Sequence, residues 1–118
     1  MPLSDERLTA TASVTRPSAG TPRAATPVTI EAKTNYQKLL DLNNARTNAS
    51  IYNEGTTTLW IDYSADVGPD QHLVSIGPGQ LWESPSACVD AIYGVWAAPA
   101  TGEPALSGKA HIRSIVLR

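Results

Sequence analysis

The sequence ASIYNEGTTTLWIDYS, residues 49–64, decides the fold class of this chain. Apolar and polar residues alternate on both sides of an interruption at residues 53–55. A period of two is typical of a half-buried β-strand, because successive side chains of a strand point to opposite faces of a sheet. We therefore expect strands at 46–53 and 57–63, joined as a β-hairpin in which Gly55 adopts a positive φ.

Similar strand segments, separated by turn residues, continue along the chain. Pro78 and Gly79 stand at the second and third positions of 77–80, which predicts a type II turn. Many short strands between turns are typical of sandwiches and jelly rolls, so we predict an all-β fold, an antiparallel β-sandwich or jelly roll of about seven to eight short strands. The other expected strands are residues 26–33, 37–42 (a strand or a single helical turn), 71–76, 81–84, 89–97 and 109–117.

The composition changes near Pro27. Residues 1–27 consist mostly of Ala, Ser, Thr and Pro and contain no aromatic residue. Such a segment buries too little apolar surface to offset the entropy cost of ordering. We predict an extended N-terminal arm at 1–27, preceding a β-sandwich domain at 28–118. The arm is either a floppy terminus or, as we prefer, a segment that orders on a partner.

The partner contacts expected in the arm are apolar anchors and cations. Leu8 and Val14 would supply the anchors, and Arg7, Arg16 and Arg23 would pair with an acidic protein surface. Fully extended, the arm would reach roughly 90 Å, which is enough to cross onto a neighbouring subunit.

The length, net charge and cysteine count exclude several classes of protein. The 118 residues suit one domain, and the formal net charge of −2 favours neither nucleic acid nor an anionic membrane as partner. A single cysteine, Cys88, rules out an internal disulfide. No segment has the pattern of a signal peptide or a membrane span. We expect a protein made in a reducing cytoplasm, or released by lysis.

No group of residues has the spacing that catalysis or metal binding requires. His72 and His111 lack HxH or HExxH spacing, and Cys88 has no nucleophile signature around it. The acids at every fourth position, Asp62, Asp66 and Asp70, lack the DxDxDG arrangement of a calcium loop. We therefore expect no enzyme, no cofactor and no metal.

The three tryptophans, Trp60, Trp82 and Trp96, have two interpretations. We prefer packing in the core or at a subunit interface, where Trp is enriched. In the alternative, Trp60 lies on an outer sheet face and stacks against sugar rings, as tryptophans do in carbohydrate-binding modules.

Four segments of the chain resemble small structural proteins of tailed bacteriophages: KLLDLNNARTNASIYNEGTTTLWIDYS, HLVSIGPGQLWESP, AIYGVWA and KAHIRSIVL. Those proteins commonly have a hairpin of the form ILdaNpaRkxLxIxNxGxxxLYV, an apolar-Pro-Gly-aromatic-Glu turn, a GaIyGIxA strand and a final strand near the C-terminus. Trp60 and Asp62 stand where the pattern often has Tyr and a small apolar residue. The resemblance covers roughly residues 38–117. The matching residues are Leu40, Asn44, Arg46, Ile51, Asn53, Gly55, Leu59, Trp60, Pro78, Gly79, Trp82, Glu83, Ile92, Gly94 and Ile112.

The resemblance implies a virion component and identifies no catalytic residue. It implies a head decoration or stabilisation (cement) protein, whose arm contacts the major capsid protein or another virion protein. A symmetric homo-oligomer, with a trimer favoured, would cover the open sheet edges of so small a domain. The alternative is a tail- or fibre-associated module that binds host-surface glycan through the face that carries Trp60.

Overall fold

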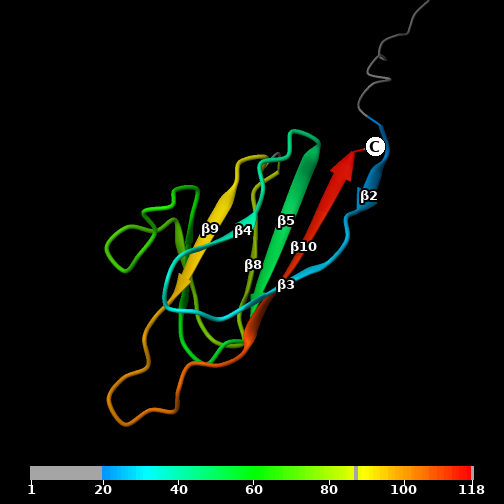
Figure 1. Ribbon diagram of the computed structural model, residues 1–118. Coiled ribbons are helices and arrows are strands. Elements are labelled where there is room, and N and C mark those ends of the chain that lie inside the picture. The colour runs from blue at the N-terminus through cyan, green and yellow to red at the C-terminus, as the bar shows by residue number, and fades with distance from the viewer. Residues whose placement is uncertain (1–19, 87, 118) are drawn as a thin grey trace, which may run out of the picture.

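The computed structural model describes residues 20–86 and 88–117 (Figure 1). Within these residues the chain is all-β, with nine strands, no helix and two antiparallel sheets of five and four strands. The five-stranded sheet contains β2 (Pro22–Ala24), β3 (Val28–Glu31), β5 (Arg46–Asn53), β8 (Leu81–Glu83) and β10 (Lys109–Leu117). The four-stranded sheet contains β4 (Gln37–Leu40), β6 (Leu59–Asp62), β7 (Val74–Ile76) and β9 (Ile92–Trp96).

The long strands β5 and β10 form the centre of the five-stranded sheet, where Figure 1 shows them side by side. On the side away from β10, β5 pairs with β8. On the side away from β5, β10 pairs with β3 and, further along, with β2. The order of the four-stranded sheet is β4-β9-β6-β7.

Both sheets contribute to one hydrophobic core, which makes the fold sandwich-like. Alternation along each strand decides which side chains enter that core, so Ile51 and Ile112 pair in register and are both buried. Each large aliphatic side chain buried in this way stabilises the fold by about 1.5–3 kcal/mol. The core residues are Ala32, Leu39, Ile51, Leu59, Ile61, Ile76, Cys88, Ile92, Trp96, Ala110 and Ile112.

The expected hairpin between residues 46–53 and 57–63 is wrong. Both strands form, but β5 pairs with β10 and β8, whereas β6 pairs with β9 and β7 in the other sheet. Residues 54–58 therefore carry the chain from one sheet to the other. A period-two pattern shows which side chains of a strand are buried. The pattern is the same whether two successive strands pair in one sheet or face each other across a core, so it does not distinguish a hairpin from a crossing.

The turn at residues 77–80 is confirmed, but its flanking strands do not pair. Gly79 has a φ of 76°, and the Gln80 amide donates to the Gly77 carbonyl oxygen over 3.1 Å. However, β7 belongs to the four-stranded sheet, and β8 pairs with β5 in the other. This turn is therefore a second crossing between the sheets.

The other expected strands are found, mostly shortened. The segment at 37–42 is a strand rather than a helical turn, and the long strand expected at 89–97 is reduced to β9. Of the expected arm, β2 pairs with residues 115–117 of β10 (Figure 1). Residues 1–19 lie outside the described residues.

Candidate functional site

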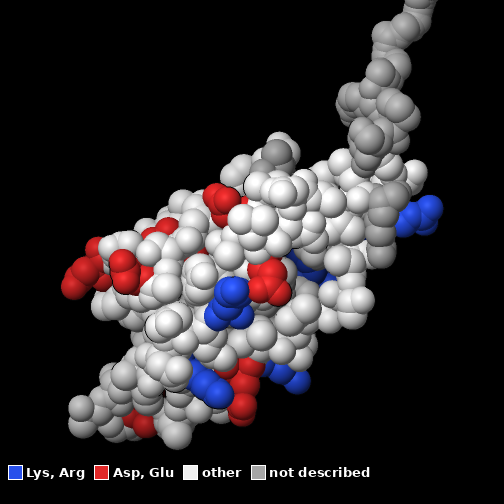
Figure 2. All heavy atoms as spheres, turned by 45° about the horizontal axis from the view of Figure 1, so that its top comes forward, with Lys and Arg blue, Asp and Glu red and all other residues white. Residues whose placement is uncertain are grey.

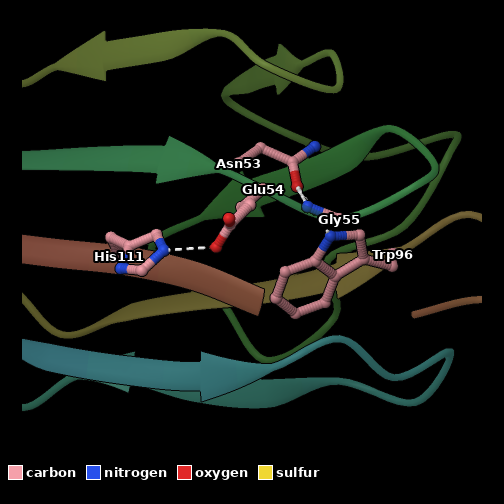
Figure 3. A network of polar contacts seen from close by, with 5 residues as sticks. All are labelled: Asn53, Glu54, Gly55, Trp96 and His111. Atoms are coloured by element: carbon pink, nitrogen blue, oxygen red, sulfur yellow. Dashed lines mark hydrogen bonds and ion pairs between the residues drawn. The ribbon is translucent and has the colours of Figure 1, made fainter. Parts of the chain in front are cut away.

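Asn53 joins the two sheets at the point where the chain crosses between them (Figure 3). Its side chain is completely buried and makes four hydrogen bonds. The amide nitrogen donates to the carbonyl oxygens of Thr57 (2.9 Å) and Ile76 (2.8 Å). The amide oxygen accepts from the Gly55 backbone N–H (2.8 Å) and the Trp96 indole N–H (3.0 Å). Two donor hydrogens and two acceptor positions are the usual capacity of an asparagine amide, so no polar atom is left for a ligand.

Gly55 is required at this corner for space and not for a positive φ, so the expectation for its backbone was wrong. Its φ lies outside the left-handed region, which the glycines with positive φ occupy elsewhere in the chain. A Cβ at position 55 would lie 2.5 Å from Nε1 of Trp96 and 2.9 Å from Oδ1 of Asn53. Glycine therefore allows the backbone to approach the indole closely enough for the Asn53 network to form.

Arg46, at the opposite end of β5, also links backbone segments through buried hydrogen bonds. Its guanidinium is buried and donates to three backbone carbonyl oxygens: Cys88 (2.7 Å), Asp41 (2.9 Å) and Asp90 (2.5 Å). These bonds tie the segments before β5 and before β9 together. Because each of its three nitrogens already donates to a backbone carbonyl oxygen and the side chain is buried, Arg46 is placed as a scaffold residue.

Cys88 is a buried thiol next to Tyr63. Its Sγ lies 3.7 Å from the Tyr63 hydroxyl oxygen. Burial, with the thiol contact and the nearby Asp90 carboxylate, raises the pKa of Tyr63 to about 12. A thiol enclosed by the core and paired with a neutral phenol is placed as a packing residue.

The outward side of the five-stranded sheet, which we call the five-strand face, is exposed and carries both apolar and charged side chains. Three rows cross it in register. The central row runs Arg113, Ser50, Glu83 across β10, β5 and β8. The flanking rows are His111, Tyr52 and Leu81 on one side, and Ile115 and Asn48 on the other, where Ile115 also pairs with Ala24 of β2.

Two hollows lie along the five-strand face and share Ser50 and Arg113. The larger, about 510 Å³, is lined mainly by small side chains, including Asn48, Ser84 and Ser114. The second, about 390 Å³, lies between Tyr52, Leu81 and the start of β3.

At one end of this face, Nε2 of His111 lies 2.5 Å from Oε1 of Glu54 (Figure 3). The hydrogen bond from His111, helped by the charges of His111 and Lys109, lowers the pKa of Glu54 below its usual value. Tyr52 lies beside this pair, with its ring centroid 6.1 Å from that of His111.

The outward side of the four-stranded sheet, which we call the four-strand face, carries aromatic rings. Trp60 alternates with the core residues Leu59 and Ile61 and stacks against His72, with ring centroids 6.1 Å apart and an interplanar angle of 28°. The His72 ring is fixed, because Nδ1 donates to the Gly68 carbonyl oxygen and Nε2 accepts from Ser75.

A second ring pair lies on the four-strand face beside β4. The rings of Tyr36 and Tyr93 have centroids 6.3 Å apart, and Tyr36 is exposed. Tyr93 pairs in register with Lys38 on β4 and with Asp62 on β6. The face thus combines aromatic rings with polar side chains.

The acidic side chains at 62, 66 and 70 do not form a metal site. They belong to the end of β6 and the loop that follows, the end of the molecule where red atoms gather in Figure 2. Asp62 accepts a hydrogen bond from the backbone amide of the next residue, Tyr63, which is a local contact within the chain. Within 20–86 and 88–117, no three His, Cys, Asp or Glu side chains are grouped closely enough to hold a metal ion. In the same residues, no helix is long and apolar enough to cross a membrane.

The residues expected to contact a partner lie in different places. Arg7, Leu8, Val14 and Arg16 lie outside the described residues. Arg23 lies on β2, exposed and opposite Val116.

Of the three tryptophans, Trp60 lies on the four-strand face, half-buried against His72. Trp96 is a core residue, and Trp82 is partly buried and packs against the core cluster, as the packing interpretation predicts.

Sequence reasoning missed the five-strand face. Arg113 and Ile115 belong to no motif, and Glu83 belongs only to the Pro-Gly-aromatic-Glu turn. Their rows form only through pairing between distant segments. The only signal in the sequence was the alternation within 109–117, which places residues 111, 113 and 115 on one side of a strand.

Comparison with protein-family models, with curated proteins and with solved structures gives no match for this chain.

Proposed function

We propose that this chain is a non-enzymatic structural protein of a tailed-bacteriophage virion, a capsid decoration or cement protein with a jelly-roll body. The strand order carries the proposal. The orders β3-β10-β5-β8 and β4-β9-β6-β7, with β2 as an added edge segment, match the strand order expected of an eight-stranded jelly roll and so support that proposed architecture. From β3 to β10 every connection except β6–β7 crosses from one sheet to the other. Jelly rolls recur in viral capsid and lectin domains, so this step is an analogy of fold.

The resemblance to phage structural proteins supports the same proposal. Among the matching residues, Arg46, Asn53 and Gly55 make the contacts that hold the crossing segments in place. The shared pattern thus corresponds to a scaffold whose buried polar groups are already paired. What such a scaffold offers to a partner is its sheet faces, its edges and its N-terminal segment.

The arm is proposed as the anchor on the virion. Because β2 is held against residues 115–117, the preceding segment starts at the margin of the five-stranded sheet. We propose that it contacts the major capsid protein or a neighbouring subunit, with Leu8 and Val14 as apolar anchors. Many copies of a weak contact then give firm attachment, because binding at several sites multiplies the effect of each.

The location is tested by immunogold labelling of gradient-purified particles, with antibody raised against residues 28–118. Label spread over the head is expected. Label confined to the tail would favour receptor recognition, and the absence of label from every particle would contradict a virion role.

The role of the arm is tested by removing residues 1–19, which leaves β2 in place. The truncated chain should remain folded, because β2 through β10 are retained, but should no longer sediment with capsids. A substitution of Arg23 with Ala in the full chain separates the contribution of β2 from that of the missing segment. Normal capsid binding by the truncated chain would overturn the anchoring role.

A second candidate function, glycan recognition at a tail or fibre, is favoured by the four-strand face. Trp60 and the Tyr36–Tyr93 pair present rings near Asp62 and Lys38, and aromatic rings beside hydrogen-bonding groups suit sugar rings. Sugar-dependent quenching of tryptophan fluorescence that Trp60→Ala abolishes would support it. Trp82 and Trp96 pack in the core region and serve as the internal reference.

A further inference from the structure

We propose that the five-strand face is a contact between two copies of this chain, related by a two-fold axis that runs parallel to β5. This contact does not depend on the decoration role. It also differs from the trimer that the sequence led us to expect, because a two-fold axis joins copies in pairs.

The charged row of the face is the first argument. Arg113 and Glu83 stand on either side of Ser50, on β10 and β8. Their strands are two strand spacings apart, about 10 Å at the usual separation. Both side chains are exposed, and neither forms an ion pair or a side-chain hydrogen bond with any residue of 20–86 or 88–117. The central row therefore carries one unpaired positive and one unpaired negative charge, placed symmetrically about Ser50.

The two-fold axis turns this row into a complementary one. Rotation about an axis parallel to β5 leaves β5 facing β5 and exchanges the sides on which β10 and β8 lie. Arg113 of the second copy then lies opposite Glu83, and Glu83 of the second copy lies opposite Arg113. The single rotation therefore gives two equivalent Arg113–Glu83 pairs across the contact. This is the self-complementarity that an isologous interface requires.

The apolar side chains and the larger hollow fit the same arrangement. Tyr52, Leu81 and Ile115 are 38%, 57% and 40% exposed on this face. Because β10 and β8 run in the same direction, the rotation brings Ile115 of the second copy opposite the residues that follow Glu83. There the hollow of about 510 Å³ is lined by Asn48 and Ser84. The rotation thus brings an exposed apolar side chain over a hollow lined by small residues.

The remaining charges of the face lie at one end of it. Glu54 lies near the axis there, so the rotation brings the two copies of Glu54 towards each other, and each carboxylate is hydrogen-bonded to His111 of its own chain. This end of the face adds no attraction, so the contact depends on the Arg113–Glu83 row and on the apolar side chains. The three rows extend over roughly 15 by 20 Å at the usual strand spacings. Two such faces together bury roughly 600 Å², less than the ~1,200 Å² of a standard specific interface, so we expect a weak contact with a dissociation constant in the high micromolar to millimolar range.

The test is a charge exchange, measured by analytical ultracentrifugation of the full chain from micromolar to millimolar concentration. Arg113→Glu and Glu83→Arg each place like charges opposite each other, and each should weaken the dimer at least about tenfold. The double variant, Arg113→Glu with Glu83→Arg, restores opposite charges at both positions and should dimerise nearly as the natural chain does.

Matched controls change the net charge equally, away from this face. Lys33→Glu matches Arg113→Glu, and Glu103→Arg matches Glu83→Arg; both positions are exposed. Neither control should change the dissociation constant. A natural chain that stays monomeric throughout, a trimer that the variants leave unchanged, or a double variant as weak as the single ones would each overturn the proposal.

A second measurement does not depend on charge. Ser50 lies on the axis, so Ser50→Cys in two copies should be joined by a short bismaleimide, while Cys88 stays buried in the core. Ser75→Cys, which faces outward from the four-stranded sheet, is the control and should not be joined. Equal yields for the two variants would contradict the two-fold contact.

Discussion

Replacement of Asn53 by Ala should remove a large part of the stability of this protein. Its side chain is completely buried and makes four hydrogen bonds, three of them fully buried. Alanine leaves the Ile76 carbonyl oxygen, the Gly55 N–H and the Trp96 indole N–H without partners. A buried polar group without a partner costs about 1–3 kcal/mol, so three of them should lower the free energy of unfolding by about 3–9 kcal/mol.

That loss is large compared with the total. Domains of this size have free energies of unfolding of about 5–15 kcal/mol. Equilibrium unfolding in urea, followed by tryptophan fluorescence, should show a midpoint lower by at least about 1 M with an unchanged slope, since the slope depends on the surface exposed.

The control is Asn48→Ala on the same strand. Asn48 is exposed and accepts a single hydrogen bond from the Thr47 hydroxyl, so the change should stay within about 0.5 kcal/mol. A loss below about 1 kcal/mol for Asn53→Ala would refute the reasoning, because the unpaired groups would then have found other partners at little cost.

Three further changes test the interior and the Glu54–His111 pair. Gly55→Ala should destabilise by about 2 kcal/mol, measured by thermal denaturation, because its Cβ would lie 2.5 Å from Nε1 of Trp96. Arg46→Met leaves three backbone carbonyl oxygens without their donor and should cost about 2–5 kcal/mol in urea unfolding. The lowered pKa of Glu54 means that its contribution to stability is present above the usual value of 4.5 and is lost as the pH falls through the lower folded pKa. His111→Ala should move the Glu54 pKa back up towards 4.5, measured by NMR titration of the carboxyl carbon.

The two interior changes each have a comparison at an open position. Gly68→Ala should be neutral within about 0.5 kcal/mol, since its Cβ would meet nothing within 4 Å. Lys33→Met, at an exposed position, is the comparison for Arg46→Met. Gly55→Ala as mild as Gly68→Ala would contradict the proposed close approach. A Glu54 pKa unchanged by His111→Ala would mean that His111 is not its main perturbing group.

The candidate surfaces could be predicted from the sequence only in part. The alternation around Trp60 placed that side chain on an outer face, and the structure shows its ring stacked on His72. Arg113, Ser50 and Glu83 come from three segments, so their common row depends on which strands pair. No spacing within the chain expresses that pairing.

The sequence by itself determined the class of fold, the positions of most strands and the buried side of each. Alternation from Arg46 to Asn53 marks a strand whatever its neighbours are, because it reflects only the geometry of an extended backbone. Tertiary structure alone decided that β5 and β6 belong to different sheets, and that Asn53 closes the corner between them. The choice between a hairpin and a crossing depends on contacts with residues far along the chain, such as Ile76 and Trp96. Those contacts come together only when both sheets close over one core.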